Sequence, residues 1–505
     1  PLLYLQVAFM SFRLSLICAL GCAILFSSTA VTADNWPSFR GSSDGFVAQS
    51  DIPTEFGPGN HEAWSIDLPR GHSSPTVWNG TVYLTAHTPK TNTLHVYAID
   101  GETGAESWHK EISVDEVENF IHPDGSAAAS SIATNGTHII AYFASSGIYC
   151  FNAGGEQLWH FPMEAARSYS GASSSPIIHN NIVYVQRVAS GSTFVVAINF
   201  NTGKQLWRHD FPVLGRLGSK SGAATVRATD KELIVHNTTG VSAHNLKTGE
   251  IIWSVRAATT ATSSLVLTDT HVYAATYVQT GEEALRPDLP AWDTLLKSAD
   301  KDNDQNISAA EFPRELFWFR RPEGEASPQS SPRIRINHVD FNKDGKVREQ
   351  EWNGFKRRFE SNRENVTDHG LLAIRLGGKG DVTKTHMTVV EKQGLPEVPS
   401  PVIGNSHLFM VKNGGILTCI DIKANQRLYR QRLGTTGTHF ASPILTGNLL
   451  IVCDGTGQIM IADISGERPK MISKNVLDDR VFATPTVVDD TLYIRTESKL
   501  YAFRK

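Results

Sequence analysis

Two acidic stretches of the sequence carry oxygen-bearing side chains at the same positions. The first runs from Asp300 to Glu311 and the second from Asp340 to Glu351. In each stretch a carboxylate or amide stands at positions 1, 3 and 5 and a glutamate at position 12, while position 7 can offer its backbone carbonyl. Ca²⁺ is a hard cation that prefers about six to eight oxygen ligands, so the pattern predicts calcium binding. The predicted ligands are Asp300, Asp302, Asp304, Asn306, Glu311, Asp340, Asn342, Asp344, Lys346 and Glu351.

The spacing of these residues is that of the EF-hand calcium loop. Position 8 is apolar in both stretches, which predicts that Ile307 and Val347 pair as a short strand between the loops. Apolar residues at helical spacing flank both loops, and we expect them to form the shared core of a helix–loop–helix pair. They are Leu296, Phe312, Leu316, Ile336, Trp352 and Phe355. An acidic surface turn is the alternative interpretation of either loop alone, whereas two loops in tandem favour metal sites.

The two loops differ at positions that tune affinity. Loop one has Gln305 where glycine normally makes the sharp turn, at a cost of about 1 kcal/mol, but it carries Ser308 at position 9. Loop two has the expected Gly345, but the positive charges of Lys343, Lys346 and Arg348 oppose a cation. We expect both loops to bind calcium with modest affinity, near the dissociation constants of about 10⁻⁴–10⁻³ M at which extracellular modules work.

A repeated hairpin pattern surrounds these loops and must position them. Small residues and a proline come first, followed by an apolar pair, a turn and a second apolar pair. Alternating apolar residues on both sides of a Gly, Asn or Asp turn predict β-hairpins. The prolines that lead these copies are Pro75, Pro176, Pro401, Pro443 and Pro485.

A second pattern follows the hairpin and ends in tryptophan. A Thr-Gly step predicts a turn because glycine reaches positive φ, and the strand after it carries the tryptophan. Trp108, Trp159, Trp207 and Trp253 recur at about 45–50 residues, the period expected for four-stranded propeller blades. Eight units can be counted, so the sequence predicts an all-β fold, an eight-bladed β-propeller. We interpret the tryptophans as packing residues between blades.

The two ends of the repeat region complement each other. The last unit lacks its outer strand, and residues 62–69, which include Trp64, have the pattern of an outer strand without a blade. Pairing the two would close the ring and remove a free sheet edge. The fifth unit is interrupted by a charged segment that contains both acidic loops. The predicted organisation is a signal segment at 1–33, propeller at 34–281, an EF-hand insertion at 282–366 and propeller at 367–505.

These repeats resemble those of a known family. The Ala-x-Asp-x-x-Thr-Gly-x-x-x-Trp unit at 98–108 is similar to the tryptophan-docking motif of PQQ-like (pyrroloquinoline quinone) eight-bladed propellers. The Trp-Pro-Ser-Phe-Arg-Gly segment at 36–41 resembles the entry segment of exported bacterial members. The family includes a non-catalytic outer-membrane assembly lipoprotein and quinoprotein dehydrogenases, so the resemblance implies a fold rather than a chemistry.

The dehydrogenases of that family imply a specific set of residues at the ring centre. They carry a vicinal cysteine pair stacked on the quinone, an aspartate base and a calcium ligand set. This sequence has no adjacent cysteines, so we carry no catalytic residue across. His72 and His439 precede predicted inner strands and could face the central channel, where polar rim residues are common.

The N-terminal residues have the pattern of a secretory signal. Arg13 precedes an apolar run at 14–26, and Val31–Ala33 fits a cleavage site before Asp34. We expect export to the periplasm or the extracellular space, with no transmembrane span after cleavage. Retention of the apolar run as a membrane anchor is the alternative, and a lipid anchor on Cys22 is a second one. The remaining cysteines are scattered, which is not the pattern of a disulfide framework.

Composition and the absence of known catalytic motifs argue against several classes of function. The 505 residues carry a formal net charge of −4, which argues against a nucleic-acid binder with a basic face. Sequence motifs of serine hydrolases, zinc proteases and P-loop enzymes are absent from the sequence. We therefore predict a monomeric, calcium-binding scaffold protein for an unknown protein or envelope partner, with calcium as its cofactor. The alternative is an enzyme, a PQQ-dependent alcohol or sugar dehydrogenase.

Overall fold

The computed structural model describes residues 35–505 except for 43, 119–121, 169, 213–221, 279–286, 319–332, 365–367 and 436. The chain divides into two compact units, Pro1–Ala33 and Asp34–Lys505. The first unit and both predicted boundaries of the insertion lie outside the described residues, so the signal segment and these boundaries stay predictions. Within the described part of the chain, no helix combines the length and apolar character needed to cross a membrane.

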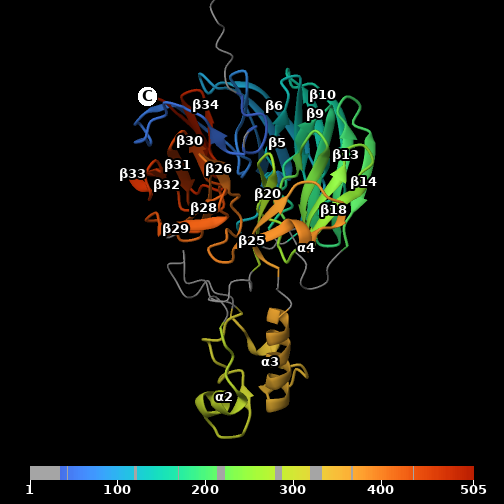
Figure 1. Cartoon of the computed structure of the whole chain (residues 1–505), viewed down its shortest axis with the longest axis vertical. Helices are drawn as coiled ribbons and strands as arrows, with labels where there is room; N and C mark the ends of the chain where they lie inside the picture. Colours follow the sequence, from blue (N-terminus) through green and yellow to red (C-terminus); the bar gives the residue numbers. More distant parts are fainter. Residues whose placement is uncertain are drawn as a thin grey trace, which may run out of the picture. The chain divides into compact units, whose positions relative to one another are not determined.

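The second unit is an eight-bladed propeller (Figure 1). Its described residues form eight sheets of four strands, two of which gain a fifth strand, and a separate two-stranded sheet. Hydrophobic clusters lie between neighbouring sheets, so each blade buries both faces of its middle strands. The prediction of an all-β, eight-bladed propeller is confirmed.

Each blade runs from a short inner strand to an outer strand. From inner to outer, blade 1 consists of β3 (Thr76–Trp78), β4 (Thr81–Thr88), β5 (Thr93–Asp100) and β6 (Glu106–Ser113), and blade 2 of β7 (Ala133–Thr134), β8 (His138–Phe143), β9 (Gly147–Asn152) and β10 (Gln157–Pro162). Blade 3 consists of β11 (Ile177–His179), β12 (Ile182–Ala189), β13 (Ser192–Asn199) and β14 (Gln205–Asp210). Blade 4 consists of β15 (Arg227–Ala228), β16 (Glu232–Asn237), β17 (Gly240–Asn245) and β18 (Ile251–Arg256).

The remaining blades follow the same order. Blade 5 consists of β19 (Val266–Leu267), β20 (His271–Thr276), β23 (Gly370–Arg375) and β25 (Met387–Glu391), and blade 6 of β26 (Val402–Gly404), β27 (His407–Lys412), β28 (Ile416–Asp421) and β29 (Gln426–Arg432). Blade 7 consists of β30 (Ile444–Thr446), β31 (Leu449–Cys453), β32 (Gln458–Asp463) and β33 (Lys470–Val476). Blade 8 consists of β34 (Thr486–Val488), β35 (Thr491–Arg495), β36 (Lys499–Phe503) and β2 (Glu62–Asp67). The added fifth strands are β24 (Gly380–Asp381) on blade 4 and β1 (Phe46–Val47) on blade 7.

Blade 8 joins the two ends of the repeat region. β2 pairs antiparallel with β36, and Trp64 lies opposite Ala502. The outer strand of this blade therefore comes from the N-terminal side of the repeats and its three inner strands from the C-terminal side, as predicted. This closure leaves no blade without its outer strand.

The Thr-Gly turn of one blade receives the tryptophan of the preceding blade. Trp64 Nε1 donates to the carbonyl of Gly101 at 3.0 Å, and a Cβ atom on Gly104 would lie 2.8 Å from the indole ring. Only glycine fits at Gly104, because its φ is +74° and the ring covers it. The predicted role of these residues in inter-blade packing is confirmed. The other tryptophans docked in this way are Trp108, Trp159 and Trp207.

A closed ring of hydrogen bonds links the starts of the eight inner strands. In each blade one backbone N–H donates to a serine or threonine hydroxyl of the next blade, at 2.9–3.2 Å. The last of these bonds runs from Thr484 N to Ser74 Oγ and closes the circle. The hydroxyl ring consists of Ser74, Ser131, Ser175, Thr225, Ser264, Ser400, Ser442 and Thr484.

The entry segment lies across the inner strands of several blades. Trp36 pairs with Val77 of blade 1, and Thr134 N of blade 2 donates to the carbonyl of Pro37. Arg40 is fully buried and donates to the carbonyl of Pro401, which directly precedes blade 6. This segment therefore links blades that lie far apart around the ring.

The insertion between β20 and β23 has its own core. It contains α2 (Trp292–Ala299), β21 (Ile307–Ser308), the 3₁₀ turn η4 (Ile336–His338), β22 (Lys346–Val347) and α3 (Glu349–Glu364). The six apolar residues predicted to flank the loops all pack in or against one hydrophobic cluster, with Trp352 and Phe355 fully buried.

Among the described residues, which leave out 319–332 between the two loops, the predicted helices are present on only two of the four loop flanks. α2 precedes loop one and α3 begins within loop two, but the residues after Glu311 form turns. Pro313 accounts for this, because it lacks an N–H and disfavours helical backbone at Phe312. The prediction of a complete helix–loop–helix pair was therefore wrong at these flanks. A short 3₁₀ turn precedes loop two in place of the other helix.

Candidate functional site

The two acidic loops share one backbone conformation. Positions 4 and 6 are left-handed in both, with φ of +58° at Asn303, +64° at Gln305, +61° at Lys343 and +84° at Gly345. The sharp turn predicted at position 6 is thus present in both loops. Gln305 adopts it without the freedom of glycine, which adds strain to loop one.

The position 1 carboxylates accept backbone N–H groups of their own loops. Asp300 accepts from Asp304 N at 3.2 Å and from Gln305 N at 3.1 Å. In loop two, Asp340 accepts from the two corresponding N–H groups at 3.3 and 2.9 Å. Both aspartates are therefore held by the turn that follows them.

The position 12 carboxylates close each loop from the other side. Glu311 accepts from Lys301 N at 2.9 Å and from Ser308 N at 2.9 Å. Glu351 accepts from Phe341 N at 3.0 Å and, less closely, from Arg348 N at 3.2 Å. Bonds from the Ser308 hydroxyl and backbone lower the pKa of Glu311 to about 2, so this carboxylate is ionised at neutral pH.

The loops are joined through their position 8 residues. β21 and β22 pair antiparallel, with Ile307 opposite Val347 and Ser308 opposite Lys346. The predicted pairing of the two apolar residues is confirmed, and both are fully buried. Of the two predicted carbonyl donors, Asn306 directly precedes β21 and Lys346 is the first residue of β22.

The remaining predicted ligands lie on the open side of each loop. Ligand atoms of Asp300, Asp302 and Asp304 all lie within 4.8 Å of one another. In loop two, Asn342 and Asp344 lie together, and Asn342 Nδ2 donates to Asp344 Oδ2 at 3.2 Å. Each loop therefore gathers its own predicted donors. All of them are oxygen donors, the type that Ca²⁺ prefers.

Two basic side chains of loop two contact the position 5 carboxylates. Lys346 Nζ lies 2.5 Å from Asp304 Oδ2 of loop one, and Arg348 Nη1 lies 2.5 Å from Asp344 Oδ2. These ion pairs lower the pKa of both aspartates. A cation bound in either loop would have to compete with an ammonium or guanidinium group for one of its ligands.

The two histidines predicted to face the channel lie in different surroundings, with His439 buried and His72 half-buried. His72 Nε2 lies 3.6 Å from Glu497, and its ring packs against Phe482. His439 Nε2 lies 3.2 Å from Thr435 Oγ1. Burial lowers the pKa of both histidines, so both are neutral at neutral pH. The structure does not bring them together as a catalytic pair.

A buried carboxyl group was missed by the sequence analysis. Glu118 lies in the irregular segment between blades 1 and 2, where it accepts a hydrogen bond from Ala172 N at 2.9 Å. Burial raises its pKa to about 7, against the opposing effects of that N–H and of Arg187. No repeat pattern or motif marks this position in the sequence, because the described residues between β6 and β7 form no strand.

The residues of this chain do not fit the quinone site that the resemblance implies. Cys150, Cys419 and Cys453 are all buried, and they belong to β9, β28 and β31 of three different blades. A vicinal cysteine pair is therefore excluded among the described residues. We derive no chemical step through a quinone.

Comparison with known proteins supports the propeller assignment. Residues 57–192 and 191–288 match the family described as outer membrane protein assembly factor BamB. Outer membrane protein assembly factor BamB of Yersinia pestis is 26% identical over 233 residues, which are 43% of this chain and 54% of that protein. The match thus spans about half the length of the curated relative.

Solved structures share the fold across nearly the whole chain. BamB from Moraxella catarrhalis superposes with a TM-score of 0.53 and 13% identity, covering 88% of this chain and 97% of its own. A europium-containing methanol dehydrogenase gives a TM-score of 0.55 and 12% identity, with 93% and 98% covered. At these identities the likeness shows the fold alone.

Proposed function

We propose that this protein is an exported, calcium-binding β-propeller that acts as a scaffold for a protein partner of the cell envelope. The two EF-hand-type loops hold Ca²⁺, and the propeller supplies the rigid frame. The observation that carries the calcium proposal is the shared geometry of the loops. Both anchor the position 1 and position 12 carboxylates to their own backbone and join through one strand pair.

The physical argument for calcium rests on charge. Loop one gathers Asp300, Asp302 and Asp304, and such like charges repel one another unless a cation is shared between them. The Lys346–Asp304 ion pair relieves only part of this repulsion, and the Arg348–Asp344 ion pair neutralises one carboxylate of loop two. A bound Ca²⁺ neutralises the carboxylates and tightens both loops around their common sheet.

The scaffold proposal rests on family likeness and on the buried polar groups. Part of the chain matches a family described as an outer membrane assembly factor, which supports a protein partner in the envelope. The cysteine pair of a quinoprotein is excluded among the described residues, and His72 and His439 lie in separate surroundings. These observations favour binding over a quinone-dependent reaction.

The test of calcium binding is a substitution in each loop. We expect calcium to raise the thermal unfolding temperature of the full chain, measured by differential scanning fluorimetry or calorimetry. Glu311→Gln together with Glu351→Gln should abolish this rise, because each loop loses its bidentate ligand. The strand signal in circular dichroism should stay unchanged, since both residues lie outside the propeller.

Glu349→Gln is the matched control for this test. Glu349 stands at position 10 of loop two, outside the predicted ligand set, and contacts Asn353 at the start of α3. This variant should keep the full calcium response. A calcium response retained by the double variant would reject the assigned ligands.

The dehydrogenase alternative has a separate test. Purified protein would be mixed with PQQ and calcium and assayed for dye reduction with alcohols and sugars. The scaffold proposal predicts neither stoichiometric uptake of the quinone nor dye reduction. Uptake together with dye reduction would overturn it.

A further inference from the structure

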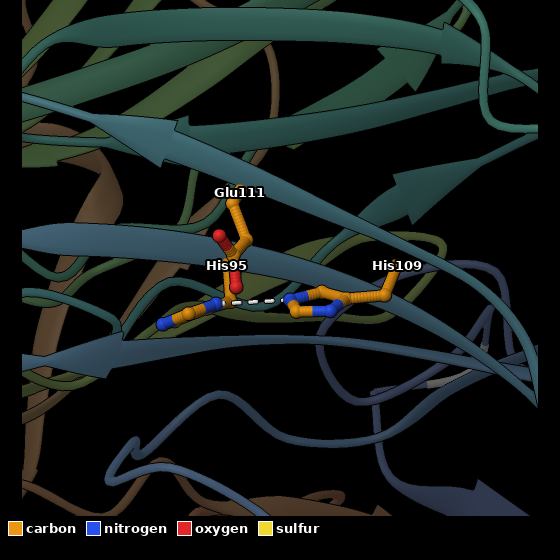
Figure 2. Close-up of side chains that lie close together, drawn as sticks. All are labelled: His95, His109 and Glu111. Carbon is orange, nitrogen blue, oxygen red and sulfur yellow. Dashed lines mark hydrogen bonds between the residues drawn. The ribbon is translucent and has the colours of Figure 1, made fainter.

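Two histidines and a glutamate meet on the outer half of blade 1. His95 lies on β5, and His109 and Glu111 lie on the neighbouring strand β6. His95 Nδ1 is 2.9 Å from His109 Nε2, and ligand atoms of all three residues lie within 4.8 Å of one another. Figure 2 shows the Glu111 carboxylate beside the hydrogen bond that joins the two imidazoles.

Strand register explains why these side chains share one face. His95 is directly opposite Glu111, and Tyr97 is directly opposite His109. Alternate residues of a strand point to the same side, so residues 95 and 97 of β5 face residues 109 and 111 of β6. The sequence contains His-x-Tyr at 95–97 and His-x-Glu at 109–111, but only the strand register shows that these residues lie side by side.

Both imidazoles are oriented by further contacts. The second nitrogen of His95, Nε2, lies 2.8 Å from the hydroxyl of Thr88. When it donates to that oxygen, Nδ1 carries a free lone pair toward His109. His109 stacks on Tyr97 with ring centroids 4.1 Å apart and an interplanar angle of 6°. In this tautomer His109 Nε2 donates to His95 Nδ1, and a metal ion would take the place of that proton, with the His109 proton moving to Nδ1 of its own ring.

Blade 2 contains the same Tyr–His stack but lacks counterparts of His95 and Glu111. Tyr149 and His160 are directly opposite and stack at 4.0 Å and 10°, as Tyr97 and His109 do. Two residues before Tyr149 the chain has Gly147, and two residues after His160 it has Pro162. The Tyr–His stack thus forms without the second histidine or the carboxylate, so packing does not require His95 and Glu111.

We propose that His95, His109 and Glu111 form a binding site for a borderline divalent transition-metal ion, with Zn²⁺ as the expected occupant. Two imidazoles and one carboxylate are a ligand set that Zn²⁺ accepts. Imidazole nitrogen also separates this site from the all-oxygen loops, which suit Ca²⁺. His109 is half-buried and Glu111 exposed, so a water molecule can take the fourth position.

Little movement is needed to admit the ion. Two nitrogens that each bind Zn²⁺ at about 2.0–2.1 Å in a tetrahedral site lie about 3.3–3.4 Å apart. The present separation is 2.9 Å, so a small rotation of the half-buried His109 ring provides the space. Glu111 is exposed and can follow this movement freely.

The experiment is a Zn²⁺ titration of the full chain without a histidine tag, in excess calcium to keep the acidic loops occupied. Calorimetry should detect a single Zn²⁺ per chain. Co²⁺ should give the visible absorption of a tetrahedral site. His95→Ala, His109→Ala and Glu111→Gln should each weaken binding by more than about 100-fold, and Thr88→Val by about 10-fold.

His160→Ala is the matched control, because it removes the equivalent stacked histidine of blade 2. It should leave Zn²⁺ affinity unchanged. Glu111→Gln should fold normally, because the side chain is exposed and does not pack in the core, so a loss of Zn²⁺ binding in this variant would reflect the missing ligand. The proposal is overturned if the unmodified chain takes up no Zn²⁺, if binding survives His95→Ala and Glu111→Gln, or if His160→Ala weakens it equally.

Discussion

Glu118 is a carboxyl group whose surroundings set its proton affinity. It is buried between blades 1 and 2 and accepts hydrogen bonds from Ala172 N and, at 3.4 Å, from the Ser168 hydroxyl. Arg187 lies near enough to favour the ionised form, but burial outweighs it and raises the pKa to about 7. The protonated form of Glu118 is therefore favoured by folding.

This raised pKa predicts a loss of stability with rising pH. Because the unfolded chain releases the proton near 4.5 and the folded chain near 7, the contribution is complete below about 4.5 and is lost as pH rises through 7. The loss is on the order of 3 kcal/mol. Glu118→Gln, which mimics the protonated acid, should remove it.

The measurement is the free energy of unfolding by urea at pH 5 and at pH 8, compared between the two proteins. Histidines with a lowered pKa, such as His72 and His439, change the stability in the opposite sense in both proteins, so the difference between the proteins isolates Glu118. Equal pH dependence in the two proteins would contradict the assignment.

Neighbouring blades contact each other both near the propeller axis and at the outer edge. Near the axis, the hydroxyl ring links each inner strand to the next. At the outer edge, Trp64, Trp108, Trp159 and Trp207 dock on the glycine turns of the next blade, and the strand pairs that hold them have a register shift nearby. Such bulges increase local twist and make an outer strand a poor template for pairing with another chain.

The hydroxyl ring predicts a specific cost for losing one acceptor. Thr484→Val keeps the shape of the side chain but leaves the buried Ser442 N–H without its partner. We expect the free energy of unfolding to fall by about 1–3 kcal/mol. Thr484→Ser retains the hydroxyl and should lose less. Urea denaturation of the two variants measures the difference, and an equal loss would mean that the hydrogen bond contributes little.

Much of the whole molecule could be predicted from the sequence. Repeats of apolar pairs, Thr-Gly turns and tryptophans identify the blades, because each blade buries the same faces. The closure of the ring through Trp64 and the pairing of Ile307 with Val347 also follow from local pattern. These features depend on residues that lie close in sequence or recur in every repeat.

Other features depend on register or on irregular segments and could not be predicted in the same way. The cluster of His95, His109 and Glu111 requires the pairing of two strands, and Glu118 lies in a segment without strands. The missing helix after loop one follows from Pro313, whose effect competes with the apolar spacing around it. The helical spacing of the apolar residues alone does not show whether a helix or the effect of the proline prevails.

The insertion gives the molecule a second element with its own core. α2, α3 and the sheet of β21 and β22 enclose one hydrophobic cluster, separate from the clusters between blades. Under the proposed function, calcium bound in the loops would stabilise this element directly. Loss of calcium should affect the insertion and leave the propeller folded.

The most direct measurement of the calcium claim is an isothermal titration of the full chain with Ca²⁺. We predict two ions per chain, one ion after either Glu311→Gln or Glu351→Gln, and none after both. Two bound ions in the double variant, or no binding by the unchanged chain, would contradict the proposed function.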